Sequence, residues 1–163
     1  LNELKNSTKD KAENLMIVDL IRNDLGKICE INSIKVDSLF NIQSFPTVHQ
    51  MTSKITGKLK KNKINESDII FSLFPGGSIT GAPKQKSVEI IDYLENYNRG
   101  VYTGSMGYIT NKGNINLNIA IRTLKINNNI GVYPVGGGIT WGSTPKNEWL
   151  EALQKTKILS LLN

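Results

Sequence analysis

The stretch Pro75-Gly76-Gly77-Ser78-Ile79-Thr80-Gly81-Ala82-Pro83-Lys84 holds three glycines and two prolines within ten residues. This composition predicts a tight turn. Apolar residues follow it at near-helical spacing: Val88, Ile90, Ile91 and Leu94. The turn is therefore expected to lead into a helix over 83–97, with Pro83 at the first helical position. Glycines beside a helix N-terminus suit a bound anion, and Ser78 and Thr80 add hydroxyl groups. A loop that only turns the chain is the alternative, and this stretch alone leaves both open.

Length and composition set the class of protein. The chain has 163 residues, of which 39% are hydrophobic and 21% charged, as is typical of one soluble globular domain. No apolar run approaches the roughly 20 residues of a membrane helix, and the polar opening lacks a signal peptide. The single cysteine, Cys29, excludes an internal disulfide and fits a cytoplasmic protein. The absence of a starting methionine indicates a fragment or a processed chain, and no linker between domains is evident.

The net charge of +6 would suit an anionic partner, but lysine makes up all but three of the twenty basic residues. Together with abundant asparagine, this indicates a general compositional bias. Aromatic residues do not alternate with the lysines, so a nucleic-acid partner is not expected. The three arginines are Arg22, Arg99 and Arg122. In so lysine-rich a chain, we expect arginine where a planar fork must hold a carboxylate or form a buried pair.

Apolar spacing and turn residues predict an α+β fold. The expected elements are a helix over 7–25, strands over 28–36 and 47–58, a helix over 66–73, the helix over 83–97, an antiparallel meander over 101–110, 114–126 and 130–135, and a helix to about residue 162. Gly26 is the predicted stop of the first helix. Thr144 is the predicted N-cap of the last helix, with Pro145 at its first position.

Two of these helices carry a pair of acids three residues apart: Asp10 with Glu13, and Glu148 with Glu151. Acids at this spacing share one face of a helix. Four carboxylates brought together would hold a hard cation such as Mg²⁺. Such pairs also occur on solvated helix faces, and spacing alone does not decide between the two.

Other kinds of site fit the sequence less well. Gly76 and Gly81 have the spacing of a phosphate-binding loop, but Ala82 stands where that loop requires lysine. One histidine and one cysteine cannot form a structural zinc site. A triad of Ser78, His49 and an aspartate stays open, although no nucleophile-elbow pattern surrounds Ser78. A lone histidine such as His49 is more often structural than catalytic.

Taken together, stretches that run in order over nearly the whole chain resemble the chorismate-utilising enzymes. This family includes the chorismate-binding subunits of aminodeoxychorismate and anthranilate synthases, and the isochorismate and salicylate synthases. The matching stretches are 12–26, 44–51, 75–84, 99–108, 119–123 and 136–151, with Lys155 beyond. Thr80 is typical of the aminodeoxychorismate synthases, whereas anthranilate synthases tend to have serine there.

The resemblance implies a Mg²⁺ site in which Glu13 and Glu151 are ligands, supported by Asp10 and Glu148. The anthranilate-type enzymes usually have glutamate in place of Asp10. The metal would hold the ring carboxylate of chorismate, and Lys155 would lie nearby.

The resemblance also implies a second carboxylate site and a set of residues beside the reacting ring. Tyr102, Arg122 and the backbone N–H groups of Gly136, Gly137 and Gly138 match residues that bind the enolpyruvyl carboxylate. An arginine fork with N–H donors is a strong clamp for such a group. Three positions beside the ring, His49, Ser78 and Thr80, are the expected catalytic residues.

The implied reaction replaces the C4 hydroxyl of chorismate with an amino group, giving 4-amino-4-deoxychorismate for p-aminobenzoate and folate synthesis. Ammonia would come from a glutamine amidotransferase subunit. Alternatives are another chorismate product, namely anthranilate, isochorismate or salicylate, or a fragment that binds without turnover.

The resemblance further implies that this chain is only part of a catalytic domain. In the family the whole domain is a layered α/β/β/α arrangement, with a lysine nucleophile and a general-acid glutamate upstream of the part matched here. We therefore expect residues 1–163 to form its C-terminal half, of antiparallel strands packed with helices. Alone, this half would expose much of its sheet and lack turnover, and it would need the rest of its own catalytic domain as a partner.

Overall fold

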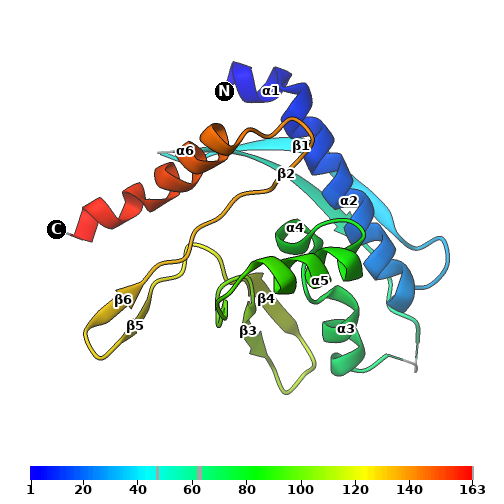
Figure 1. Cartoon of the computed structure of the whole chain (residues 1–163). Helices are drawn as coiled ribbons and strands as arrows, with labels where there is room; N and C mark the ends of the chain where they lie inside the picture. The colour runs from blue at the N-terminus through cyan, green and yellow to red at the C-terminus, as the bar shows by residue number, and fades with distance from the viewer. Residues whose placement is uncertain (47, 62–63, 163) are drawn as a thin grey trace. The chain divides into compact units, whose positions relative to one another are not determined.

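The computed structural model describes residues 1–46, 48–61 and 64–162 (Figure 1). Its elements are α1 (Asn2–Asn6), α2 (Thr8–Ile28), β1 (Lys35–Ser44), β2 (His49–Thr56), α3 (Glu66–Leu73), α4 (Gly77–Thr80), α5 (Lys84–Leu94), β3 (Ser105–Ile109), β4 (Ile115–Ile119), β5 (Lys125–Asn127), β6 (Ile130–Val132), α6 (Pro145–Thr156) and the 3₁₀ helix η1 (Lys157–Leu162). The described strands pair as three antiparallel hairpins. The chain divides into unit 1, Leu1–Gly77, and unit 2, Ser78–Asn163. The α+β prediction is confirmed.

The long helix α2 organises unit 1. It begins as predicted, because the Ser7 hydroxyl caps it by accepting a hydrogen bond from the backbone N–H of Asp10 at 3.1 Å. The predicted stop at Gly26 is wrong, since the helix continues to Ile28, which is only 3% exposed. Burying that side chain offsets the roughly 1 kcal/mol that glycine costs inside a helix. The strand predicted over 28–36 is also wrong, because Cys29 forms only an isolated bridge with Leu59 and β1 starts at Lys35.

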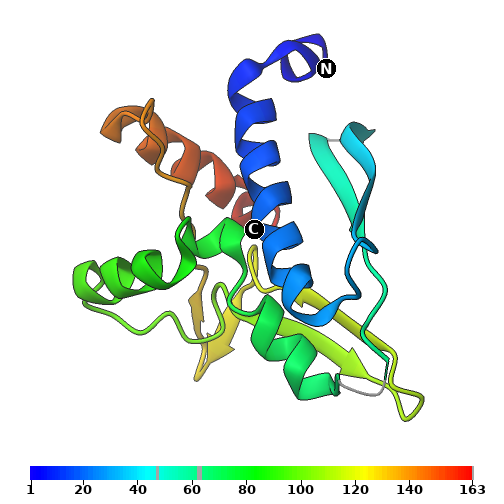
Figure 2. The same cartoon turned by 90° about the vertical axis from the view of Figure 1, so that its right-hand side faces the viewer.

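The hairpin of β1 and β2 lies beside α2, as Figure 2 shows. The Ser53 hydroxyl donates to the Asn14 side chain at 2.6 Å, so a hydrogen bond joins the hairpin to the helix. The predicted strand over 47–58 is confirmed by β2, although Thr47 lies outside the described residues. The predicted helix over 66–73 is confirmed by α3, which begins at a capping box of Asn65 and Asp68.

The glycine-rich stretch is a turn, as predicted, and it also contains the one-turn helix α4. Gly81 has a φ of +132°, and a Cβ there would lie 2.7 Å from the Ser87 hydroxyl oxygen, so this position requires glycine. The predicted helix over 83–97 is confirmed by α5, which ends earlier, at Leu94. Pro83 is the N-cap of α5, not its first residue as predicted, because its ψ of 138° is extended.

The predicted continuous strand over 114–126 is wrong. Strand β4 ends at Ile119, and β5 begins only at Lys125. Between them, the backbone of Arg122 takes a left-handed φ of +53°. Ala120 is 1% exposed and pairs through its backbone with Thr103 and Gly104, which fixes the chain where it leaves the hairpin. The apolar alternation in the sequence thus continues through residues where the strand is interrupted, so the pattern alone does not reveal the interruption.

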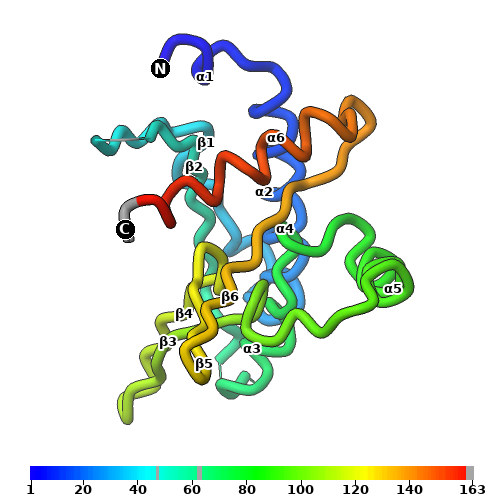
Figure 3. Tube along the Cα trace, turned by 60° about the vertical axis from the view of Figure 1, so that its left-hand side comes forward, coloured from blue at the N-terminus to red at the C-terminus, as the bar shows by residue number. Residues whose placement is uncertain are grey.

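A tight turn joins β5 to β6, with Asn128 and Asn129 both at positive φ. After β6 an extended segment leads to α6, as the trace in Figure 3 shows. Thr144 caps α6 and Pro145 is its first residue, as predicted. The last residues form the 3₁₀ helix η1 in place of a continued α-helix. Within the described ranges, no helix is long and apolar enough to cross a membrane.

Candidate functional site

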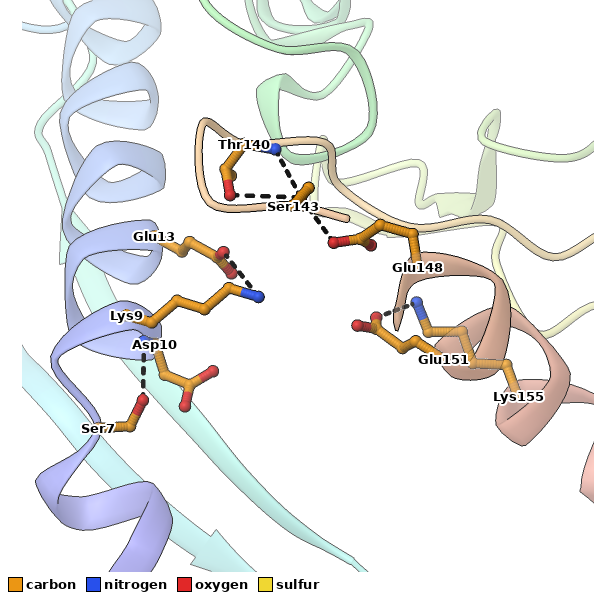
Figure 4. A network of polar contacts seen from close by, with 9 residues as sticks. All are labelled: Ser7, Lys9, Asp10, Glu13, Thr140, Ser143, Glu148, Glu151 and Lys155. Carbon is orange, nitrogen blue, oxygen red and sulfur yellow. Dashed lines mark hydrogen bonds and ion pairs between the residues drawn. The ribbon is translucent and has the colours of Figure 1, made fainter. Parts of the chain in front are cut away.

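The two acids of α6 are held by side-chain partners. The Ser143 hydroxyl donates to Glu148 at 2.6 Å and accepts from the backbone N–H of Thr140 at 3.0 Å. One turn further along, Lys155 pairs with Glu151, with 2.7 Å between Nζ and Oε1 (Figure 4). These carboxylates are therefore oriented before any ligand binds, and their oxygens are the donors that a hard cation prefers.

A glycine segment passes directly beside these acids. Lys155 Nζ donates to the carbonyl oxygen of Gly136 at 2.7 Å. A Cβ at Gly137 would lie 3.0 Å from Glu148 Oε2 and 3.8 Å from Glu151 Oε1. Any side chain at Gly137 would therefore crowd the carboxylates, and glycine lets the backbone approach them.

The same segment also meets Tyr102. A Cβ at Gly136 would lie 2.8 Å from the phenol oxygen of Tyr102, whereas a Cβ at Gly138 would have no neighbour within 4 Å. Unit 2 thus brings together most of its predicted site residues: Tyr102, Gly136, Gly137, Glu148, Glu151 and Lys155. This cluster, here called the glycine–carboxylate cluster, combines a phenol, an ammonium group and two carboxylates around an exposed backbone.

The electrostatics around Tyr102 favour its neutral form. Burial raises the pKa of the Tyr102 phenol above its ordinary value of 10.0, while the charge of Arg99 acts to lower that pKa. The Arg99 guanidinium carbon lies 5.9 Å from the centroid of the Tyr102 ring. At neutral pH the phenol is therefore a hydrogen-bond donor, as a carboxylate site requires.

The remaining predicted residues of unit 2 lie on α4 and after β4. Ser78 is exposed and Thr80 is half-buried, both on α4. Arg122 is exposed, and no hydrogen bond or ion pair joins its guanidinium to another residue in the described part of the chain. The roles of these three residues stay predictions.

Unit 1 carries the other acid pair and the histidine. Glu13 is 41% exposed and lies 3.8 Å from Lys9, one turn earlier on α2 (Figure 4). His49 opens β2, and its Nδ1 lies 3.0 Å from the Ser44 hydroxyl. Asp10 and His49 both line a hollow of about 580 Å³, which also has apolar walls. An acid and a titratable ring thus share one surface.

The predicted Mg²⁺ site draws on both units and stays a prediction. Among the described residues, neither unit alone groups three or more His, Cys, Asp or Glu side chains as a metal site would. The donor set still fits the ion, since four carboxylates supply the oxygen ligands that Mg²⁺ prefers.

Sequence reasoning missed two supporting contacts. Ser143 orients Glu148, and the two carboxylate oxygens of Glu95 accept hydrogen bonds from Nε and Nη2 of Arg99. Helical spacing could not have identified the second contact, because α5 ends at Leu94 and the pair of Glu95 and Arg99 lies beyond it. Arg99 itself satisfies the expectation that an arginine here holds a carboxylate.

Comparison with known proteins gives one consistent result. The profile of a family described as chorismate binding enzyme matches residues 1–160. Aminodeoxychorismate synthase (chloroplastic) of Arabidopsis thaliana is 50% identical over 155 residues, covering 95% of this chain and 17% of the relative. Anthranilate synthase component 1 of Saccharolobus solfataricus is 44% identical over 157 residues, covering 96% of this chain and 37% of the relative.

Among solved structures, anthranilate synthase component I from Streptococcus pneumoniae matches with a TM-score of 0.89 at 36% identity. The match covers 96% of this chain and 36% of that chain. The predicted fold is thereby confirmed as part of the anthranilate synthase component I fold. The chain spans well under half the length of each of these proteins.

Proposed function

The chain belongs to the chorismate-binding enzymes, and we propose that it forms the chorismate-binding part of an aminodeoxychorismate synthase. In this proposal the complete enzyme replaces the C4 hydroxyl of chorismate with an amino group. The product, 4-amino-4-deoxychorismate, is a precursor of p-aminobenzoate and folate, and the reaction takes place in the cytoplasm.

The observation that carries the proposal is the glycine–carboxylate cluster. Chorismate has two carboxylates, so its site must supply several groups that bind anions. Gly136 and Gly137 lie beside the Tyr102 phenol and the Lys155 ammonium group, and all of these can present N–H or O–H donors. Arg122 adds a guanidinium without an internal partner among the described residues, which suits a fork on the enolpyruvyl carboxylate.

The acids have a different role in the proposal. Glu13 and Glu151 would ligate Mg²⁺, with Asp10 and Glu148 in support. When bound, the ion offsets the charge of the ring carboxylate and orients the substrate. Lys155, now paired with Glu151, can turn its ammonium group to that same carboxylate.

The residues beside the ring would manage protons and the leaving hydroxyl. His49 can donate or accept a proton as the C4 hydroxyl departs, and the nearby Ser44 hydroxyl limits the orientations of its ring. Ser78 and Thr80 would hold ring oxygens through their hydroxyl groups.

The choice of product rests on two observations. The aminodeoxychorismate synthase named above is 50% identical and the anthranilate synthase component 1 is 44% identical, a modest difference. Thr80 is the residue that the resemblance associates with aminodeoxychorismate synthases. Anthranilate synthesis is the second candidate, favoured by the TM-score of 0.89 to an enzyme with that name.

The proposal includes two partners. A glutamine amidotransferase subunit would supply ammonia, and the rest of the catalytic domain would cover apolar surface that this part exposes. On the β3 strand, for example, Met106 is 51% and Tyr108 60% exposed. Side chains of this type are normally buried, so a covering segment would stabilise them.

Product analysis tests the function. The full polypeptide that carries this sequence is incubated with chorismate, ammonia and Mg²⁺, and the products are identified by liquid chromatography and mass spectrometry. We expect 4-amino-4-deoxychorismate as the main product. Anthranilate in its place would refute the preferred specificity, and unchanged chorismate would refute the proposed enzyme activity. Thr80→Ser should shift the product ratio if this residue sets specificity.

A further inference from the structure

Arg99 forms a two-point ion pair with Glu95 in unit 2. Its Nε donates to Glu95 Oε2 at 2.6 Å, and its Nη2 donates to Glu95 Oε1 at 2.5 Å. The two side chains are only 22% and 25% exposed. This two-point pairing fixes the plane of the guanidinium at the C-terminal end of α5.

The third nitrogen of Arg99 reaches two other segments. Its Nη1 lies 3.2 Å from the Thr103 hydroxyl oxygen and 3.4 Å from the carbonyl oxygen of Ile79 on α4. Together with the contact to the Tyr102 ring, one guanidinium joins α5, α4 and the turn before β3. Lysine cannot reproduce these contacts, because its single ammonium group lacks the planar fork.

The turn that carries Tyr102 needs such support. Thr103 has a φ of +64°, a left-handed conformation that is unfavourable for a β-branched residue. Its backbone N–H donates to Ala120 at 2.9 Å, and its hydroxyl oxygen accepts from Arg99. Arg99 therefore helps to hold the turn in a conformation that the sequence disfavours.

Resting on the proposed function, we propose that Arg99 is a positioning residue for the substrate carboxylate. It holds Tyr102 and the α4 hydroxyls in place and does not touch substrate, since each of its three guanidinium nitrogens already has an acceptor within the protein. Tyr102 in turn lies against Gly136, which places the phenol in the glycine–carboxylate cluster.

Kinetics of Arg99→Lys test the proposal in the full polypeptide. The enolpyruvyl carboxylate does not react, so a misplaced Tyr102 should weaken the binding of the substrate and of the transition state by the same amount. We expect KM for chorismate to rise about tenfold with kcat changed less than about threefold. The control is Glu89→Gln, which breaks an exposed pair with Lys86 within α5 and should leave both constants unchanged. An unchanged KM in Arg99→Lys would overturn the proposal.

A double-mutant cycle tests whether the effect passes through Tyr102. With Tyr102→Phe the carboxylate contact is already lost, so adding Arg99→Lys should raise KM by less than about threefold. Full additivity of the two changes would show that Arg99 acts elsewhere and would overturn the proposal.

A measurement without turnover separates this proposal from the proposed function. Tyrosine labelled with ¹³C at Cζ reports the ionisation of each phenol by NMR, and Tyr102→Phe identifies the Tyr102 signal. Because the charge of Arg99 lowers the pKa of Tyr102 and that of Glu95 raises it, Arg99→Met should raise this pKa and Glu95→Gln should lower it. The third charged neighbour that affects Tyr102 is Tyr97, and neither variant replaces this residue.

The NMR titration of Tyr102 and the assay for chorismate consumption can fail independently. If neither variant moves the Tyr102 pKa, the contact is absent and the positioning role is wrong. If the pKa moves as expected but the parent protein does not consume chorismate, the proposed function fails while the Arg99–Tyr102 contact is supported.

Discussion

The two acid pairs are built differently, although both consist of carboxylates three residues apart on a helix. On α6, Glu148 and Glu151 each have a side-chain partner within 2.7 Å, from Ser143 and Lys155. On α2, the partner of Glu13 is Lys9 at 3.8 Å, in an exposed pair of little energetic weight. The α6 pair is thus fixed by its own unit, whereas the orientation of Glu13 must come from a ligand or another part of the protein.

The difference teaches that identical spacing does not make equivalent sites. A carboxylate that is already oriented binds a cation or a charged substrate without paying the entropy of ordering its side chain. Changes around α6 should therefore affect function more than matched changes elsewhere.

The largest effect is expected for Glu151→Gln. This change removes a predicted metal ligand and leaves Lys155 without the carboxylate at 2.7 Å. We expect kcat/KM for chorismate in the full polypeptide to fall about 100-fold or more. Steady-state turnover at saturating Mg²⁺ measures it. Glu89→Gln, which removes an exposed acid from α5, is the matched control. Parental turnover in Glu151→Gln would refute the metal assignment.

Two neighbouring glycines offer the next comparison. A methyl group at Gly137 would lie 3.0 Å from Glu148 Oε2, whereas one at Gly138 would meet nothing within 4 Å. Gly137→Ala should push Glu148 off Ser143 and lower kcat/KM about tenfold, equivalent to about 1.4 kcal/mol. Gly138→Ala adds a methyl group without a protein neighbour and keeps the backbone N–H, so it should lower kcat/KM less than Gly137→Ala does. Equal activities in the two variants would show that close packing on the carboxylates is not needed.

Substitutions at two serines distinguish a residue that orients an acid from a residue that caps a helix. Ser143→Ala frees Glu148, so we expect a several-fold loss of activity with a small change in stability. Ser7→Ala removes the N-cap of α2 and should lower the free energy of unfolding by about 1 kcal/mol with little loss of activity. Urea unfolding and initial rates, measured on both variants, distinguish the two roles. A reversed pattern would contradict the contrast between the acid pairs.

The sequence predicted local structure well where one residue decides it. Thr144 and Pro145 mark the start of α6 because a hydroxyl cap and a preset φ act locally. The prediction that the first helix stops at Gly26 was wrong, because burial of Ile28, a tertiary effect, outweighs the local preference of glycine. The break at Ala120 was missed for a similar reason, since it depends on pairing with Thr103 and Gly104.

The candidate site could be predicted only in part. Spacing gave the two acid pairs, but it could not show that Gly137 lies against Glu148, because that approach depends on how the irregular loop over 138–144 folds back onto α6. The family resemblance supplied Tyr102 and Lys155, and the structure brings both to the same glycine segment. Ser143 carried no signal, since a serine before an N-cap is common in any turn.

The smallest expected effect is a pH dependence of stability at Glu95, and it tests whether the ion pair next to Tyr102 of the glycine–carboxylate cluster stabilises unit 2. Hydrogen bonding to Arg99 holds the pKa of Glu95 below its ordinary value of 4.5. Because this pKa is lowered on folding, the stabilisation is fully present above pH 4.5 and is lost as the pH falls through the folded-state value. The stability difference between the parent and Glu95→Gln should therefore be largest near neutral pH and shrink below pH 4.5. Urea unfolding at several pH values measures it, with Glu89→Gln as the exposed control. A difference that stays constant from pH 7 to pH 3 would mean that folding does not lower the pKa of Glu95, so the charge of its carboxylate would not stabilise unit 2 through Arg99.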